Sequence, residues 1–575
     1  MGKSEKIWNG VIAAEIAVVS FLFFQFFYAY HLFFKEQILL FIYTPDYLLS
    51  YFSKPGWLTC LTGDFLTQFF YLRGGGPFVL AALFSIEWIL SYLSIKKISK
   101  SQLAKFWAVL PVIADFVSHL SLAHTARIST GLILVLLLFL FYSGIKNKYL
   151  ATVVAVIFSI AGHWFIGSAA FVFPVLVLLH KLNSKYFVPN TLLLPLVFVL
   201  PLLIRGTYLL PLNETLLFPA TQIEGLLPLA VFLFVLVIEV ILQKTKTRPL
   251  FVKLSIGIIG LALAIGGFKN NVNFNREKIF ALDSETYFGN TKKVIELAGK
   301  SKFENRFLSY YTNMALAKTG QLPHRLLEFY QPAIHGLILP VSQQENWQTI
   351  LFSNELFYLL GDMNLAQHSS MLGNTFSPYQ RSSRMMKRLA EINMVNGDYP
   401  GAEKFLRILG KTLFHKKWVR KKSAENNAHC NSNWLIEKRT QIAHSDTIRN
   451  SFDYIESIEF LVQQNPHNLI ALDYLLSYYL LNKDLVSFKT AYDKYVKSLK
   501  RPVPKVYGEA LLVKLFQDKV TQKEVLDYRI GTEQMRGFAD YTNFFKETRL
   551  DIERSQDKFG DTYWFYYHFA TFKEN

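Results

Sequence analysis

Long apolar segments within about the first 270 residues constrain the fold of this chain more than any other sequence feature. A helix needs roughly 20 apolar residues to cross a bilayer core about 30 Å thick. About nine segments approach that length, near residues 11–33, 77–95, 105–124, 128–145, 149–166, 168–181, 189–205, 225–243 and 251–268. The fourth to seventh are short or closely spaced, so one pair among them is open to interpretation as a re-entrant hairpin. The sequence therefore predicts a polytopic α-helical membrane domain over residues 1–269.

The composition agrees with a chain that combines a membrane domain with a soluble one. Of its 575 residues, 51% are hydrophobic and 18% are charged, whereas soluble domains contain about 25% charged residues. This argues against an ordinary soluble enzyme. The formal net charge of +18 is explained by basic residues beside the spans and requires no nucleic-acid partner. The only two cysteines, Cys60 and Cys430, are too few for a disulfide framework or a recognisable zinc cluster.

Basic residues beside the spans predict the orientation, because loops rich in Lys and Arg stay in the cytoplasm. One set of alternate connections is the richer in basic residues: Lys3, Lys6, Lys96, Lys97, Lys100, Lys146, Lys148, Lys181, Lys185, Lys244, Lys246, Arg248 and Lys253. The other set holds fewer per residue: Lys35, Lys54, Arg73, Arg127 and Arg205. With an odd number of spans, the amino terminus is expected in the cytoplasm and the chain after residue 269 outside. In a bacterial inner membrane the outside is the periplasm.

The connection over residues 34–76 contains more apolar sequence than a simple loop requires. Its segments 45–52 and 57–70 are too short to span a bilayer and are typical of helices lying in the membrane interface. We interpret this loop either as a surface segment resting on lipid or as the roof of an active site.

Ionisable side chains near the outer ends of the spans are the main chemical signal, because a charge in hydrocarbon costs at least about 2.5 kcal/mol and needs a partner or a water-filled cavity. These candidates are His31, Glu36, Asp115, His119, His124, Arg127, His163 and Arg205. Asp115 and His119 are four residues apart and therefore lie on one helical face. Together the candidates predict an outward-facing cavity for a polar or phosphorylated head group. The alternative is that the His and Arg side chains merely reach the lipid head groups.

The rest of the chain, residues 270–575, is predicted to be an all-helical domain of repeats. Helical periodicity begins near residue 277, and four similar helix-turn-helix units have turns centred on Gly320, Gly361, Gly397 and Lys483. The last interval between turns is long enough to hold two units of about 43 residues. The segment 396–399, followed by Ala402, resembles the small-residue turn of tetratricopeptide (TPR) repeats. Such units stack into an α-solenoid whose concave surface suits a polypeptide partner.

Two further segments of this domain stand out. The basic stretch 415–422 is interpreted as a solvated loop, with contact to anionic lipid or to an acidic partner as the alternative. The aromatic segment 561–567 needs burial, and we expect it to dock onto the repeats or onto the membrane face.

Several short segments resemble an uncharacterised family of bacterial multi-pass membrane proteins with a helical-repeat tail. They are Glu36-Gln37, Pro55-Gly56, Phe65-Leu66-Thr67-Gln68-Phe69 and Asp561-Thr562-Tyr563-Trp564. The resemblance covers the whole chain and implies no activity.

More distantly, the layout looks like the C-type (GT-C) glycosyltransferase fold, in which a long loop after the first span carries an acidic catalytic residue. The acidic pair or Asp-X-Asp usual in that loop is missing, and only Glu36, Asp46 and Asp64 are available.

The similarity to the C-type glycosyltransferase fold implies roles for the candidate residues. A lipid-linked sugar enters from the bilayer, and Asp64 or Glu36 acts as general base, with Asp115 as a further acidic candidate. His119, His124 and Arg127 stabilise the departing phosphate. The remaining substrate-binding candidates are His31, His163 and Arg205. No cofactor is identified and no ligand spacing indicates a metal, although a divalent metal is compatible with a glycosyltransferase.

Three functions remain open on sequence grounds. The first is a membrane protein that presents a periplasmic TPR-like platform for assembly of an envelope or secretion complex. The second is a glycosyltransferase that uses a lipid-linked donor, with the repeats binding the acceptor. The third is a transporter, suggested by Glu15, Glu87 and Glu239 within hydrophobic stretches. The expected partners are the lipid bilayer, a lipid phosphate and a protein on the repeat surface, without nucleic acid.

Overall fold

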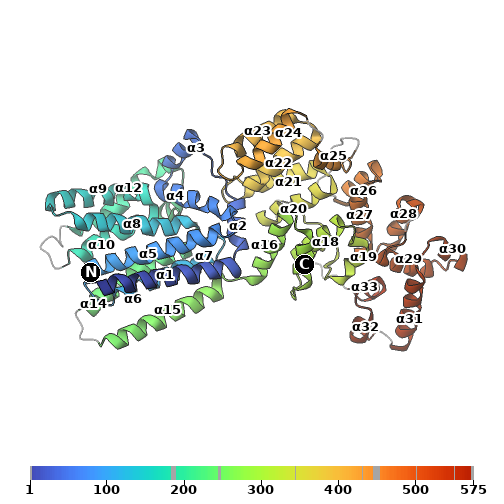
Figure 1. The fold of residues 1–575 in the computed structure, drawn as a ribbon, viewed down its shortest axis with the longest axis horizontal. Coiled ribbons are helices and arrows are strands. Elements are labelled where there is room, and N and C mark those ends of the chain that lie inside the picture. The colour runs from blue at the N-terminus through green and yellow to red at the C-terminus, as the bar shows by residue number, and fades with distance from the viewer. Residues whose placement is uncertain are drawn as a thin grey trace. The chain divides into compact units, whose positions relative to one another are not determined.

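The computed structural model describes residues 3–182, 190–243, 248–342, 345–429, 432–443, 454–499, 502–548 and 551–570 (Figure 1). Helices are the regular secondary structure of these residues, which confirms the prediction of an all-α protein. Contacts divide the chain into two units, one of residues 1–277 and 411–416 and the other of residues 278–410 and 417–575. This division is one of contacts, whereas the predicted boundary at residue 269 marks the end of the apolar segments; the membership of 411–416 in the first unit was not predicted. Cys430, Lys185, Lys244 and Lys246 lie outside the described residues.

The first unit contains helices of membrane-spanning character. Six described segments are long and apolar enough to cross a bilayer: Ile7–Phe26, Gly75–Ser99, Ala126–Gly144, Lys148–His180, Ile223–Leu242 and Pro249–Asn271. They correspond to α1 (Lys3–Phe26), α5 (Gly75–Ser99), α8 (Ala126–Gly144), α9 (Lys148–Ile166) with η3 (Gly167–Phe171) and α10 (Val172–His180), η4 (Ile223–Leu226) with α14 (Leu227–Leu242), and α15 (Pro249–Asn271). Large apolar side chains such as Ile258 and Leu261 are exposed on α15. Lipid rather than water suits such a surface, so the first unit is a membrane domain.

Three of the nine predicted spans correspond to shorter helices. They are α6 (Ala104–Trp107) with α7 (Val109–His119), α10, and α12 (Leu193–Tyr208). The predicted first span, 11–33, is wrong at its end. Helix α1 stops at Phe26 and a separate helix, α2 (Tyr30–Gln37), follows, so His31 lies on α2 and not at the end of a span.

Contacts between helix ends give the directions in which the helices of this unit run. Glu5 at the start of α1 forms an ion pair with Lys96 near the end of α5, so these two helices are antiparallel (Figure 1). Lys253, near the start of α15, lies over the ring of Phe106 in α6, and Asn271, at the end of α15, donates to the carbonyl of Val117 in α7 at 3.0 Å. Helix α15 therefore runs parallel to the α6–α7 segment.

The segment after Gly167 reverses direction relative to α9. The rings of Phe158 in α9 and Phe173 in α10 are 6.0 Å apart, although the left-handed Gly167 lies between them in the chain. At one end of α8, a β-carbon on Gly131 would lie 3.2 Å from that of Ala169. At the other end, the rings of Tyr142 and His180 are 6.5 Å apart. Helix α10 therefore runs parallel to α8 over most of the length of α8.

The connection after the first span folds into short helices, as predicted. They are α3 (Pro45–Leu49), η1 (Ser50–Ser53), α4 (Trp57–Thr67) and η2 (Gln68–Tyr71), and a later connection contains α13 (Leu212–Leu217). One face of α4 is buried, and the Thr59 hydroxyl donates to the carbonyl of Ile166 at 3.0 Å. The loop is thus packed onto the helix bundle through α4 rather than resting freely on its surface.

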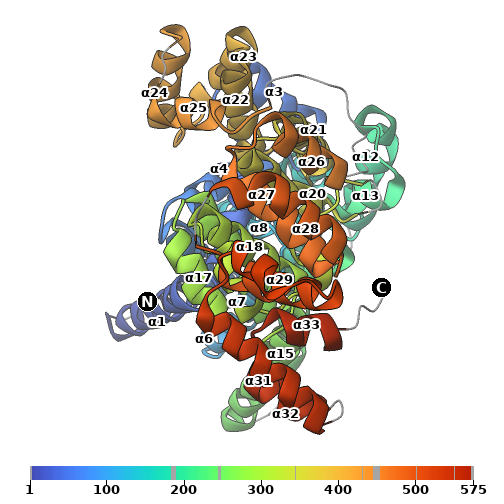
Figure 2. The same ribbon diagram turned by 90° about the vertical axis from the view of Figure 1, so that its right-hand side faces the viewer.

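The second unit consists of helices joined mostly by short turns. In chain order they are α16 (Phe274–Tyr287, of which residues from 278 belong here), α17 (Thr291–Gly299), α18 (Arg306–Lys318), α19 (Leu322–Arg325), η5 (Leu326–Glu328), η6 (Ala333–Gly336), α20 (Trp347–Leu360), α21 (Met363–Phe376), α22 (Ser383–Asn396), α23 (Tyr399–Gly410), α24 (Lys416–Asn427, of which residues from 417 belong here), α25 (Asn433–Arg439), α26 (Tyr454–Gln464), α27 (Leu469–Leu481), α28 (Leu485–Tyr495), η7 (Lys497–Leu499), α29 (Lys505–Gln517), α30 (Gln522–Asp527), α31 (Thr532–Thr548), α32 (Ile552–Phe559) and α33 (Tyr563–Phe569). Consecutive helices pack in pairs, for example α20 on α21, α22 on α23, and α27 on α28 (Figures 1 and 2).

The four predicted turns have one backbone geometry. Gly320, Gly361, Gly397 and Lys483 all have positive φ angles of 60° to 91°. In each case the next residue donates its N–H to the carbonyl five positions earlier, as in Asp362 to Phe357 at 2.9 Å and Asp484 to Tyr479 at 2.9 Å. This is the Schellman bond that closes a helix end. The positions of these turns are confirmed.

Two further turns with the same bond were not predicted from the sequence. Gly289 and Lys519 have positive φ, and the N–H groups of Asn290 and Val520 donate to the carbonyls of Glu285 and Leu515 at 2.8 and 3.3 Å. In three of the six turns an Asp directly follows the left-handed residue, and its carboxylate accepts an N–H of the next helix. The acid therefore caps the second helix of the pair while the residue before it ends the first.

The carboxy-terminal aromatic segment docks onto the helices of the second unit, as one of the two predicted alternatives states. Tyr563 and Trp564 are buried, and the Tyr563 N–H donates to Glu509 Oε2 at 2.7 Å. The hydroxyls of Tyr563 and Tyr566 donate to carbonyls at the end of α27.

The prediction of a loop at 415–422 is wrong, because helix α24 starts at Lys416 and His415 is buried.

Candidate functional site

A buried cluster of polar side chains connects α2, α7 and α8 in the first unit. Asp115 and His119 lie on one face of α7, as their spacing predicts, and His124 follows in the turn before α8. His124 Nε2 donates to Asp115 Oδ1 at 3.0 Å, and His119 Nε2 lies 3.8 Å from the same oxygen. His119 Nε2 is also hydrogen-bonded to Ser129 Oγ in α8 at 2.8 Å. Both histidines and Asp115 are buried.

Helix α2 closes this cluster from another side. His31 Nε2 donates to the backbone carbonyl of His119 at 3.0 Å, and the Lys35 ammonium donates to the carbonyls of His119 and His124 at 3.3 and 2.8 Å. The carboxylate of Glu277 accepts the backbone N–H of His31 at 3.1 Å. Burial lowers the pKa of Lys35 to about 7, against the opposing effect of the negative charges on Asp115 and Glu277. Lys35 and Glu277 were not among the predicted site residues, although both ionisable side chains are buried here.

A third carboxyl group joins the cluster from α5. Glu87 is completely buried near the middle of its helix, and the carboxyl group of Asp115 is the neighbouring acid that acts on it electrostatically. Two neighbouring carboxyl groups away from water repel each other when both are charged, and a cation beside them relieves that repulsion. The cluster therefore combines three carboxyl groups, those of Glu87, Asp115 and Glu277, with one lysine.

Asp64 and Arg127 form a separate ion pair between α4 and α8. Arg127 Nε and Nη2 each donate to a carboxylate oxygen of Asp64 at 2.7 Å, and the Tyr51 hydroxyl donates to Asp64 Oδ2 at 2.8 Å. The close approach of α4 to α8 depends on Gly63, since a β-carbon there would lie 2.6 Å from Arg127 Cα. Asp64 is thus engaged by a bidentate partner in this structure.

The other predicted site residues lie elsewhere in the first unit. Glu36 Oε1 is 3.6 Å from His415 Nε2, a residue of the segment 411–416 that belongs to this unit. His163 is buried at the end of α9, where its backbone carbonyl accepts the Gly56 N–H at 3.0 Å. Arg205 is exposed near the end of α12. The structure thus brings His31, Asp115, His119 and His124 into one cluster and pairs Asp64 with Arg127.

A pocket of about 360 Å³ opens between η1, α9 and α12. Its walls include Phe52, Trp164, Leu200 and Tyr208, which are mostly apolar. The Trp164 indole N–H donates to the carbonyl of Phe52 at 3.1 Å, which fixes one wall. Such a pocket suits an acyl or isoprenoid chain better than a sugar.

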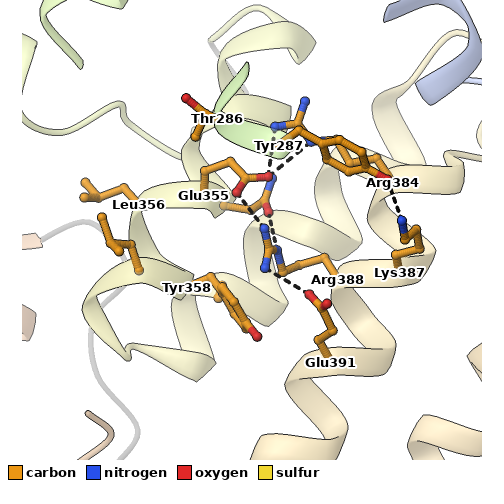
Figure 3. A network of polar contacts seen from close by, with 12 residues as sticks. Thr286, Tyr287, Glu355, Leu356, Tyr358, Arg384, Lys387, Arg388 and Glu391 are labelled. Atoms are coloured by element: carbon orange, nitrogen blue, oxygen red, sulfur yellow. Dashed lines mark hydrogen bonds and ion pairs between the residues drawn. The ribbon is translucent and has the colours of Figure 1, made fainter. Parts of the chain in front are cut away.

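A separate ionic network lies inside the second unit and was not predicted (Figure 3). The Arg384 side chain in α22 is 1% exposed, and it pairs with Asp283 Oδ2 at 2.7 Å and with Glu355 Oε1 at 2.8 Å. One turn further along α22, Arg388 pairs with Glu355 Oε2 at 2.6 Å, and its guanidinium lies 3.8 Å from the centre of the Tyr358 ring. Burial acts to raise the pKa of Glu355, but the charges of Arg388 and Arg384 outweigh it and hold the pKa at about 2. The network links α16, α20 and α22 through side chains that are almost fully buried.

Comparison with known proteins gives a family but no activity. No curated protein and no solved structure matches the chain. One family model matches residues 3–570, which include both structural units. The protein is therefore a member of the family of unknown function DUF6057.

Proposed function

We propose that this protein anchors a TPR-like helical-repeat platform to the membrane, and that a polypeptide partner docks on that platform. The observation that carries the proposal is the recurrence of one turn geometry at Gly289, Gly320, Gly361, Gly397, Lys483 and Lys519. Each turn joins two helices that cannot bury their apolar faces alone, so neighbouring pairs must stack. Stacked pairs present an extended surface of the kind that binds peptides and subunits.

The same proposal places this platform in the periplasm of a bacterial cell. Nine crossings result if the segment Lys148–His180 crosses twice, once as α9 and once as α10, and if α7 and α12 cross together with the other five longer segments. The parallel course of α10 and α8, and of α15 and α6–α7, supports this count. An odd count separates the two termini, and the Lys-rich connections then lie in the cytoplasm.

The basic face of α24 indicates the chemistry of the partner. Lys417, Arg420 and Lys421 are exposed and share one side of the helix by their spacing. None of the three forms an ion pair within the described part of the chain. Because three unpaired cations on one helical face attract negative charge, we expect an acidic protein segment to dock there.

Photocrosslinking in cells tests this function. A photoreactive amino acid at Ala424, which is exposed on α24 and leaves the three cations in place, is expected to capture a discrete protein. Reversing the charges in the triple variant K417E/R420E/K421E should lower the yield about tenfold or more, because like charges then face the partner. Immunoblots of the crosslinked product measure the yield.

Matched controls lie on the same unit. Ala539 in α31 is also exposed, and a photoreactive residue there should give no such product. The triple variant K519E/K523E/R529E changes the net charge by the same amount at other exposed positions and should leave the yield at 424 unchanged. Equal capture at 539, or adducts with lipid only, would contradict the proposal.

A second candidate function is a glycosyltransferase that uses a lipid-linked sugar, and the apolar pocket between η1, α9 and α12 favours it. The pocket suits the lipid chain of such a donor. In this function Arg127 would exchange Asp64 for the donor phosphate, which frees the carboxylate as a base. A lipid phosphate bound at Arg127 in protein purified with its native lipids would favour the enzyme over the platform.

A further inference from the structure

The buried cluster of Asp115, His119 and His124 has the donor set of a metal site. Each residue offers one ligand atom, and these atoms all lie within 4.8 Å of one another. Two of the separations are 3.0 Å, from His124 Nε2 to Asp115 Oδ1, and 3.8 Å, from His119 Nε2 to the same oxygen. Ligand atoms about 2.0–2.1 Å from a tetrahedral Zn²⁺ are about 3.3 Å apart, so small side-chain shifts suffice.

Two buried histidine nitrogens without hydrogen-bond partners also support a metal site. Nδ1 of His119 and Nδ1 of His124 have no hydrogen-bond partner among the residues that the structure describes, although both rings are at least 96% buried. Buried polar atoms are normally satisfied, so these two nitrogens require an explanation. A metal ion beside the rings satisfies such a nitrogen where it takes Nδ1 of that ring as its ligand.

The charges of the cluster also leave room for a divalent cation. Glu87, Asp115 and Glu277 bring three carboxyl groups into a buried region, and Lys35 is the neighbouring lysine. Carboxylate oxygens are ligands for divalent cations, and a cation beside them offsets the cost of burying acidic groups away from water.

The surroundings hold the ligands in place. Lys35 binds the backbone carbonyls of both His119 and His124, which fixes the turn that carries the second histidine. His31 holds the carbonyl of His119 from the side of α2. Metal sites depend on such supporting hydrogen bonds to keep their ligands oriented.

From this geometry we infer that the first unit binds one divalent transition-metal ion through Asp115, His119 and His124. Two imidazoles and one carboxylate are ligands that Zn²⁺ prefers, and three protein ligands leave a position for water or for Glu87. The inference is independent of the proposed platform, because none of these residues belongs to the second unit.

Metal titration of the purified full-length protein tests the inference. After removal of metal by a chelator, we expect the wild-type protein in detergent to bind about one equivalent of Zn²⁺ per chain, as three protein ligands predict. His119→Gln, His124→Gln and Asp115→Asn should each weaken binding by about tenfold or more, since each removes one ligand. His180→Gln, a change to a histidine of α10 outside the group, should leave binding unchanged.

Cobalt provides a readout that does not depend on variants. Titration of metal-free wild-type protein with Co²⁺ should produce visible absorption bands of a low-symmetry site with nitrogen ligands, and added Zn²⁺ should abolish them. Failure of the wild-type protein to bind Zn²⁺ stoichiometrically, or absence of these bands, would overturn the inference. Wild-type affinity in well-folded His119→Gln and His124→Gln proteins would overturn it equally.

Discussion

Replacement of Arg384 by Met is expected to destabilise the second unit by about 3–5 kcal/mol, because it leaves buried carboxylates without their counter-ion. Arg384 pairs with Asp283 and Glu355, and all three side chains are at most 7% exposed. Met retains much of the apolar volume of the Arg side chain, so the loss of stability measures the removal of the charge and not the formation of a cavity. The urea dependence of proteolysis of this unit, in the full-length protein in detergent, measures the effect.

A surface arginine of the same unit provides the matched control. The Arg325 and Glu328 side chains form an ion pair with 34% and 38% of their surface exposed. Exposed pairs contribute at most about 1 kcal/mol, so Arg325→Met should change the urea midpoint little. If Arg384→Met unfolds no more readily than Arg325→Met, the buried network does not hold the three helices together.

The pH dependence of the Arg384 effect follows from the pKa of Glu355. Burial acts to raise this pKa, but the charges of Arg388 and Arg384 hold it at about 2, below the ordinary value of 4.5. A depressed pKa contributes stability that is present above the unfolded value and is lost as the pH falls through the folded value. The difference between wild type and Arg384→Met should therefore be the same at pH 6 and pH 8 and shrink only in strong acid.

Substitution of Gly63 by Ala is expected to have the largest effect in the membrane unit. A β-carbon at this position would lie 2.6 Å from both the backbone nitrogen and Cα of Arg127. Backbone cannot move aside as a flexible side chain does, so α4 must shift away from α8, at a cost of about 1–3 kcal/mol or more. The shift also separates Asp64 from Arg127, whose paired bonds are 2.7 Å long.

Cys60 is a built-in reporter of this displacement. It is a free cysteine on the buried face of α4, and burial raises the pKa of its thiol to about 12. Because the thiolate is the reactive form, Cys60 should react slowly with maleimide in the native protein. In a Cys430→Ser background, Gly63→Ala should raise the labelling rate by more than about tenfold.

A glycine without close neighbours separates this effect from a general response to alanine. A β-carbon added to Gly144, at the end of α8, would meet no atom within 4 Å, so Gly144→Ala should leave Cys60 labelling unchanged. Slow labelling in Gly63→Ala, equal to that of Gly144→Ala, would mean that α4 does not rest on α8 as the structure has it.

Local sequence signals predicted the parts of the structure that depend on neighbours in the chain. The spacing of Asp115 and His119 placed both on one face of α7, and glycine turns identified Gly320, Gly361 and Gly397. The turn at Lys519 was missed because lysine is not a typical left-handed residue, and only the bond from Val520 to Leu515 reveals it.

Contacts between segments distant in the chain could not be predicted from the sequence. Glu87 was recognised as an ionisable residue within a hydrophobic stretch, but its proximity to Asp115 depends on the register of α5 against α7. Lys35 was assigned to a loop because nothing local shows that α2 turns it toward the carbonyls of His119 and His124. His415 was attributed to a solvated loop, since its burial depends on the segment 411–416 belonging to the first unit.

The central claim is that the second unit is exported while the Lys-rich connections remain in the cytoplasm. Cysteine labelling in spheroplasts tests it, with Cys60 and Cys430 replaced by Ser and one new cysteine at Lys523 or at Lys146, both exposed. A membrane-impermeant maleimide should label Lys523→Cys in intact spheroplasts as fast as after lysis, and label Lys146→Cys only after lysis. If Lys523→Cys reacts only after lysis, the unit is cytoplasmic and the odd number of crossings is wrong.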